Sequence, residues 1–125
     1  MKFIETDEAP KAIGPYSQAV KVERFLFLSG QIPIDPQTNQ LIQGDFKDEV
    51  RQVLKNIEAI LLSQGLRRED IVKTTCFLKD MKLFPDFNEV YGEFFGKHKP
   101  ARSTIEFSAL PKNAKVEIEV IALIP

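Results

Sequence analysis

Apolar and polar side chains alternate along two stretches near the end of the chain, and this alternation predicts two β-strands. Residues 102–109 put every second side chain, beginning with Arg102, on a polar face and the others on a mostly apolar face. Residues 116–123 repeat the alternation, and residues 110–114 carry the Pro and Asn expected of a turn. If the two strands pair antiparallel, Arg102, Thr104 and several glutamates gather on one face, although the pattern leaves their register open.

Helical spacing of apolar residues predicts two helices. The first is expected to begin at the N-cap Asp45, present an apolar stripe from Phe46 to Leu61, and end at Gly65. The second is expected over residues 87–95, after a break at 80–86 that contains Pro85. Further strands are predicted at residues 2–6, 16–22, 25–32, 41–42 and 71–79.

The order of these elements predicts an α+β fold in which one sheet carries two helices on one face, with residues 1–125 forming a single domain. Two helices cover only one side of a sheet. The strand at 25–32 is apolar on both alternate sets, so it is expected to be buried on both faces. We therefore predict that a second copy of the chain covers the other face, and that the protein is a homo-oligomer with sites between subunits.

Composition narrows the function. A net charge of −1 in 125 residues gives no basic surface for nucleic acid, and no apolar run is long enough to span a membrane. The single cysteine excludes an internal disulfide and fits a reducing compartment, so a cytoplasmic location is expected. With one histidine and one cysteine, no zinc cluster is predicted, and no phosphate-binding loop motif occurs. We expect His98 to be a solvated surface residue and Cys76 a small core residue.

Arg102 is the strongest candidate for chemistry. An arginine on a largely buried sheet face requires an anionic partner, because an unpaired buried cation is too costly. One interpretation is a structural ion pair with Glu106, Glu117 or Glu119. The other is a bidentate clamp for a substrate carboxylate, with a nearby glutamate that orients water or moves a proton. Spacing alone leaves both open.

Five short motifs resemble those of one known family. They are IGPYSQA at 13–19, SGQIP at 29–33, PARS at 100–103, LPK at 110–112 and VEIE at 116–119. In this order and spacing they resemble the RidA (YjgF) family over nearly the whole chain. The resemblance implies a chorismate-mutase-like fold and a homotrimer, with helices outside and three clefts between subunits.

The resemblance also implies an activity: hydrolysis of reactive 2-imino acids, such as 2-iminobutanoate and 2-iminopropanoate, to 2-keto acids and ammonia. These imines and their enamine tautomers are released by pyridoxal-phosphate dehydratases, and the hydrolysis itself needs no cofactor or metal. By likeness, Arg102 binds the substrate carboxylate and Glu117 activates water. The remaining substrate-binding residues implied are Tyr16, Ser29, Gly30, Asn88 and Thr104.

Thr104 stands where many bacterial members have cysteine, so a mechanism that needs a thiol there does not apply. Two other functions stay open. A non-catalytic module, either a small-carboxylate sensor or a chaperone-like partner, would use Arg102 in the same way. An endoribonuclease or translation inhibitor is less favoured because of the acidic pI and the lack of a basic, aromatic-lined stripe.

Overall fold

The computed structural model describes residues 1–125 and confirms the predicted α+β architecture. Its six-stranded sheet consists, in spatial order, of β1 (Lys2–Ile4), β2 (Ala19–Val22), β3 (Phe25–Gln31), β8 (Val116–Leu123), β6 (Ile71–Leu78) and β7 (Ala101–Glu106). All neighbouring strands are antiparallel except β6 and β7, which are parallel. A separate two-stranded ribbon is formed by β4 (Ile34–Asp35) and β5 (Gln40–Leu41).

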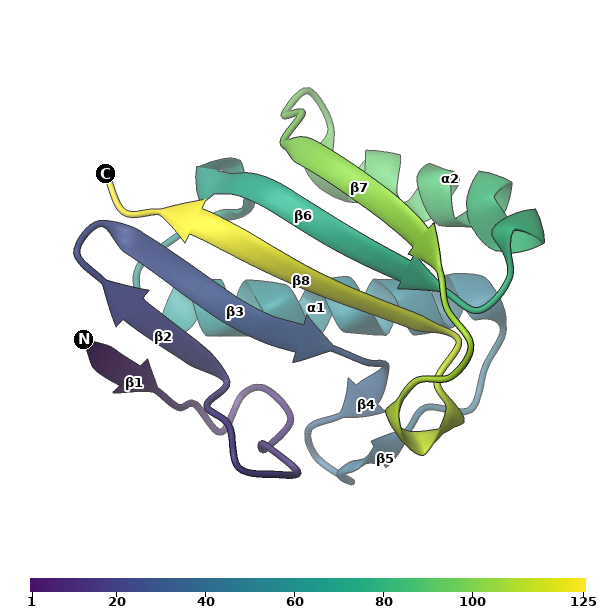
Figure 1. Ribbon diagram of the computed structural model, residues 1–125, viewed down its shortest axis with the longest axis horizontal. Helices are drawn as coiled ribbons and strands as arrows, with labels where there is room; N and C mark the ends of the chain where they lie inside the picture. Colours follow the sequence, from purple (N-terminus) through teal and green to yellow (C-terminus); the bar gives the residue numbers. More distant parts are fainter.

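Two helices, α1 (Phe46–Ser63) and α2 (Phe84–Phe95), lie on the same face of this sheet (Figure 1). The predicted N-cap is confirmed, because the Asp45 side chain accepts a hydrogen bond from the backbone N–H of Asp48 at 2.9 Å. Gly65 follows the helix with φ of 70°, a conformation that favours glycine. The predicted break at 80–86 was wrong at its end: α2 already begins at Phe84, since Pro85 is well tolerated in a first helical turn.

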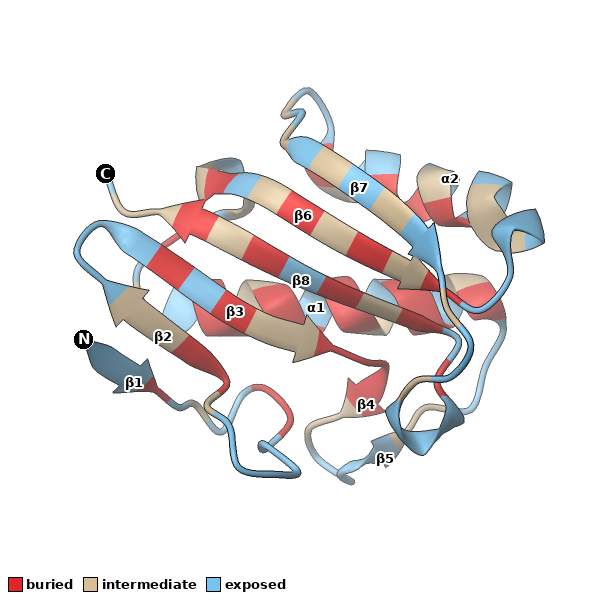
Figure 2. Cartoon of the chain, in the orientation of Figure 1, coloured by how far each residue is buried: buried red, intermediate tan, exposed pale blue.

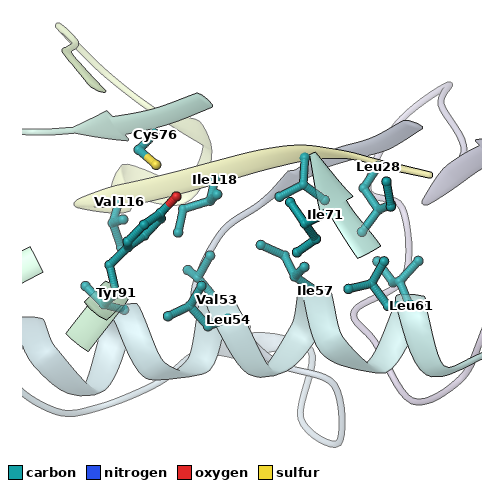
Figure 3. Packing of buried hydrophobic residues seen from close by; sticks show 14 of the residues in the cluster. Leu28, Val53, Leu54, Ile57, Leu61, Ile71, Cys76, Tyr91, Val116 and Ile118 are labelled. Atoms are coloured by element: carbon teal, nitrogen blue, oxygen red, sulfur yellow. The ribbon is translucent and has the colours of Figure 1, made fainter. Parts of the chain in front are cut away.

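The core fills the layer between the helices and the sheet. Buried and less buried residues alternate along β3, β8 and β6 (Figure 2). In Figure 3 the side chains of Val53, Ile57 and Leu61 on α1 point at Ile71 and Ile118 on the sheet, and all five are buried to 0% exposure. Burying a side chain of this size contributes about 1.5–3 kcal/mol, so this layer is the main source of stability.

The predicted pairing of the last two strands was wrong. β6 lies between β7 and β8, and the Cα partner of Arg102 is Thr74 on β6. Parallel neighbours need a crossover connection, and α2 supplies it between β6 and β7 (Figure 1). In the observed register Arg102 shares its face with Thr74 and Val120, whereas Glu117 shares the opposite face with Phe77.

The face of the sheet away from the helices is open in this chain. Phe25 and Phe27 on β3 are each 43% exposed, and Ile105 on β7 is 48% exposed. The strand predicted at 25–32 was expected to be buried on both faces, but its own chain covers only one of them. That a second copy covers this open face stays a prediction.

The strand predicted at 16–22 begins only at Ala19, because residues 13–16 form bends. Neither helix is long and apolar enough to cross a bilayer.

Candidate active site

Arg102 and Glu117 lie on opposite faces of the sheet. Arg102 points toward α2, where its Nη1 donates a hydrogen bond to Oδ1 of Asn88 at 2.8 Å. On β8, Val116 and Ile118 are fully buried beneath the helices, so the intervening Glu117 points to the open face. The prediction that Arg102 and Glu117 share one polar face of the sheet was therefore wrong within one chain. Each residue forms its own half of a site.

The Arg102 half is an aromatic cradle with one amide. The central guanidinium carbon lies 4.8 Å from the ring centre of Tyr91 and 5.4 Å from that of Phe84. The three ion pairs of the chain are Lys47–Glu89, Arg51–Asp48 and Arg68–Glu58. The proposed structural ion pair of Arg102 with a glutamate was therefore wrong for this chain. A half-buried guanidinium with one neutral partner keeps donors free for an anion.

Thr104 follows two residues later on the same face of β7. Its hydroxyl oxygen is buried and makes no hydrogen bond within the chain. A buried hydroxyl without a partner is uncommon, because its desolvation is not compensated. It lies near Arg102 as a second polar group without a partner in the chain, and its contact with a ligand stays a prediction.

A buried hydrogen bond fixes the ring beneath Arg102. The hydroxyls of Tyr91 and Thr74 are 2.8 Å apart, and Thr74 is fully buried. Figure 3 shows the Tyr91 hydroxyl reaching up toward the sheet near Cys76. Burial raises the pKa of Tyr91, so the hydroxyl stays protonated. Sequence analysis missed this role, because Tyr91 fitted the apolar stripe of α2; the need of a buried tyrosine hydroxyl for a partner was the available signal.

We expect Tyr91→Phe to destabilise the protein by about 1–3 kcal/mol, because it leaves the buried Thr74 hydroxyl with only the weak contact from Cys76 Sγ at 3.8 Å. Adding Thr74→Val removes that second polar group and should recover most of the loss. Denaturant unfolding of the two single variants and the double variant measures the coupling. Strictly additive losses would show that the two hydroxyls do not act as a pair.

The Glu117 half lies at the bulge of β3. The pairing register between β3 and β8 shifts between Leu28 and Gln31, which places a bulge at Ser29 and Gly30. A Cβ on Gly30 would lie 2.6 Å from Oε2 of Glu117, so any larger residue there requires the Glu117 side chain to move. A small pocket of about 50 Å³ is lined by Glu117, Gly30 and Tyr16, among others. The structure thus brings three of the expected residues together.

Ser29 has a structural bond instead. Its Oγ donates to the carbonyl of Ser17 at 2.6 Å, and Ser29 is not part of the pocket wall. Gln18, which sequence analysis passed over, holds another wall in place. Its Nε2 donates to the carbonyls of Pro10 at 2.8 Å and Thr6 at 3.0 Å, which anchors the segment preceding the pocket.

Burial raises the pKa of Glu117 above its ordinary value of 4.5, and the neighbouring Glu119 adds to the shift. The folded protein therefore binds a proton here more tightly than the unfolded chain. The stability associated with the protonated form is present at low pH and is lost as the pH rises from 4.5 through the raised pKa. A carboxylate held against its solvation preference is typical of a functional position.

We expect Glu117→Gln to raise the melting temperature at about pH 7.5 and to leave it unchanged at about pH 4, where both side chains are neutral. Melting curves at the two pH values test this. Glu93→Gln, at an exposed glutamate of α2, is the matched control. A melting temperature lowered by Glu117→Gln at the higher pH would contradict the expectation.

The remaining two candidates differ in outcome. Cys76 is a buried core residue as expected, and burial raises the pKa of its thiol to about 11. His98 was expected to be solvated, and this was wrong. It is half-buried, lies 6.0 Å from Phe95 between ring centres, and its Nε2 is 2.7 Å from the carbonyl oxygen of Ile71. The hydrogen bond to Ile71 on β6 holds His98 against the fold, and the spacing of residues along the chain does not reveal this contact.

The chain is thus a small α+β protein whose edge arginine has a neutral amide partner and no carboxylate partner within the chain. The family model described as Endoribonuclease L-PSP matches residues 6–124. A RutC family protein of Pyrococcus horikoshii is 56% identical over 121 residues, covering 97% of this chain and 96% of that protein. The 2-iminobutanoate/2-iminopropanoate deaminase of Mus musculus is 46% identical over 122 residues, covering 98% and 90%. The crystal structure of Escherichia coli TdcF with bound serine superimposes with a TM-score of 0.95 at 44% identity, covering 100% of both chains.

These matches span the whole chain and agree with the fold. The chain belongs to the RidA (YjgF) family, as its motifs indicated.

Proposed function

We propose that the protein hydrolyses reactive 2-imino acids to 2-keto acids and ammonia, with 2-iminobutanoate and 2-iminopropanoate as substrates. The observation that carries the proposal is the half-buried Arg102, which has an amide and aromatic rings around it and no carboxylate partner in its chain. A relative at 46% identity is named for this activity, and TdcF was crystallised with serine, an α-amino acid. Both ligand types carry the α-carboxylate that Arg102 suits.

The chemistry requires few groups. Arg102 would bind the carboxylate and hold the imine carbon in place, with the Thr104 hydroxyl beside it. Glu117 would accept a proton from a water as that water adds to the imine carbon. Starting from the protonated imine, this addition gives a neutral carbinolamine. Glu117 would pass its proton to the amino group and take up the hydroxyl proton as the C–N bond breaks, so that ammonia leaves with the keto acid and then accepts that proton as ammonium. A raised pKa suits Glu117 to this role, because it brings the base nearer to neutral pH.

The two halves require two chains. Since Arg102 and Glu117 face opposite sides of one sheet, the proposed site joins the Arg102 half of one subunit to the Glu117 half of another. The exposed Phe25, Phe27 and Ile105 on the open face support such an assembly, because large apolar side chains gathered on one face favour association. A homotrimer is the assembly we propose, on the family resemblance. Dehydratases that release imines would supply the substrate in the cytoplasm.

A coupled assay tests the function. Threonine dehydratase and threonine generate 2-iminobutanoate, and the appearance of 2-ketobutyrate is followed with and without this protein. We expect the wild type to accelerate the release of 2-ketobutyrate with no added cofactor. Arg102→Ala should give no acceleration. Glu117→Gln separates a catalyst from a sensor. A deaminase should lose turnover in this variant, whereas a sensor should keep its affinity for the ligand. No acceleration by a properly assembled protein that still binds 2-ketobutyrate would reject the deaminase and favour a carboxylate sensor.

A further inference from the structure

A larger pocket lies beside Arg102, at the edge of the sheet where α2 runs along β7 (Figure 1). It has a volume of about 330 Å³ and is lined by the last turns of α2 and the segment that leads into β7. Its ionisable lining residues other than Tyr91 are His98, Lys99 and Arg102. No aspartate or glutamate lines it, so the pocket is a basic cavity in an otherwise slightly acidic protein.

The charges of this pocket are not neutralised within the chain. None of the three ion pairs involves Lys99 or Arg102. Lys99 donates one hydrogen bond, to the carbonyl of Gly96 at 2.8 Å, which leaves two of its N–H groups free. Arg102 likewise donates to the neutral amide of Asn88 only. A concave surface with two cations that no carboxylate of the chain neutralises favours an anionic ligand.

His98 has its tautomer fixed by the fold. A carbonyl oxygen only accepts, so the 2.7 Å contact with Ile71 places the hydrogen on Nε2. Nδ1 is then the free nitrogen of the ring. When the ring is protonated, Nδ1 becomes a further donor to an anion in the pocket. Packing against Phe95 holds the ring in this orientation.

We propose that this pocket binds a second acidic group on the substrate, so that the substrates include 2-imino dicarboxylic acids such as 2-iminoglutarate. This rests on the proposed function, in which Arg102 binds the α-carboxylate. Lys99 then binds the side-chain carboxylate, and His98 joins it through Nδ1 in the protonated form of the ring. The pocket volume equals roughly ten water molecules in the liquid, which is ample for a five-carbon acid. The reaction is unchanged: water adds to the C=N bond and ammonia leaves.

Binding of the stable keto-acid products tests the proposal without relying on turnover. By titration calorimetry, the assembled wild type should bind 2-ketoglutarate about tenfold or more tightly than 2-ketobutyrate, because charged hydrogen bonds are the strong ones. Lys99→Met should abolish this preference and leave 2-ketobutyrate binding unchanged. Lys97→Met is the matched control, since Lys97 is exposed in the same segment and does not line the pocket. His98→Gln keeps a donor for the Ile71 carbonyl and should weaken the binding of 2-ketoglutarate but not that of 2-ketobutyrate.

Kinetics then separate the two proposals. The kcat/KM for 2-iminoglutarate, made by an amino acid oxidase from glutamate, is compared with that for 2-iminobutanoate. Selective binding of 2-ketoglutarate that depends on Lys99, without hydrolysis of either imine, would support the pocket and reject the deaminase. Hydrolysis of 2-iminobutanoate with equal binding of both keto acids, or with no effect of Lys99→Met, would overturn the pocket proposal alone.

Discussion

Replacing Arg102 with lysine will lower kcat/KM for 2-iminobutanoate by about a hundredfold or more, although the positive charge is kept. Lysine cannot present two parallel N–H donors to a carboxylate, and it loses the contact of the guanidinium with the rings of Tyr91 and Phe84. Losing one or two charge-assisted hydrogen bonds, each worth about 1.5–3 kcal/mol, accounts for this magnitude. The measurement is the coupled keto-acid assay, run with size-exclusion chromatography to show that assembly is intact.

Arg68 provides the control within the same chain. Its guanidinium also lies over a ring of α2, 4.1 Å from the centre of Phe94, and its Nε donates to Glu58 at 2.9 Å. Arg68 therefore has the carboxylate partner that Arg102 lacks. We expect Arg68→Lys to cost some stability, about 1 kcal/mol or less for a partly exposed pair, and to leave activity unchanged. Equal activity of wild type and Arg102→Lys would show that the forked geometry is not needed.

The elements predicted well were those set by local spacing. α1 was found with its N-cap Asp45 because the cap and the apolar stripe lie within a few residues of each other. The pairing of the last strands was missed because the insertion of β6 between β7 and β8 depends on contacts far apart in sequence. A two-residue period places Arg102 and Glu117 on faces of their own strands, and only the register of both strands with β6 shows that these faces are opposite.

The sequence allowed a prediction about a side-chain partner only where the residue type itself requires one. The expectation of an anionic partner for Arg102 came from its residue type and stays a prediction, whereas Asn88 and Tyr91 are its neighbours because α2 crosses over β7. Asn88 reached the candidate site through the family resemblance and not through spacing. The His98 contact with Ile71 joins residues 27 positions apart, so no local pattern contained it.

Gly30→Ala will reduce activity by about a hundredfold, because it displaces Glu117. The added Cβ would lie 2.6 Å from Oε2, 2.7 Å from Cδ and 2.9 Å from Cγ of Glu117, so the whole end of that side chain must move. A catalytic group misplaced by about 1 Å costs on the order of a hundredfold in rate. The coupled assay measures kcat, and binding of 2-ketobutyrate shows whether the carboxylate clamp is intact. Binding should be weakened far less than turnover, since Arg102 belongs to the other half of the site.

A double-variant cycle ties this loss to Glu117 and not to the backbone. In wild type, Gly30→Ala forces a clash and should lower the free energy of unfolding. In a Glu117→Ala background the clashing atoms are absent, so the same substitution should cost much less. Gly44→Ala is the second control, because its Cβ would approach Asp48 Oδ2 as closely as 3.0 Å, far from either half of the site. If Gly30→Ala costs the same stability in both backgrounds, the bulge itself requires glycine, and the close approach of Glu117 is not the reason for it.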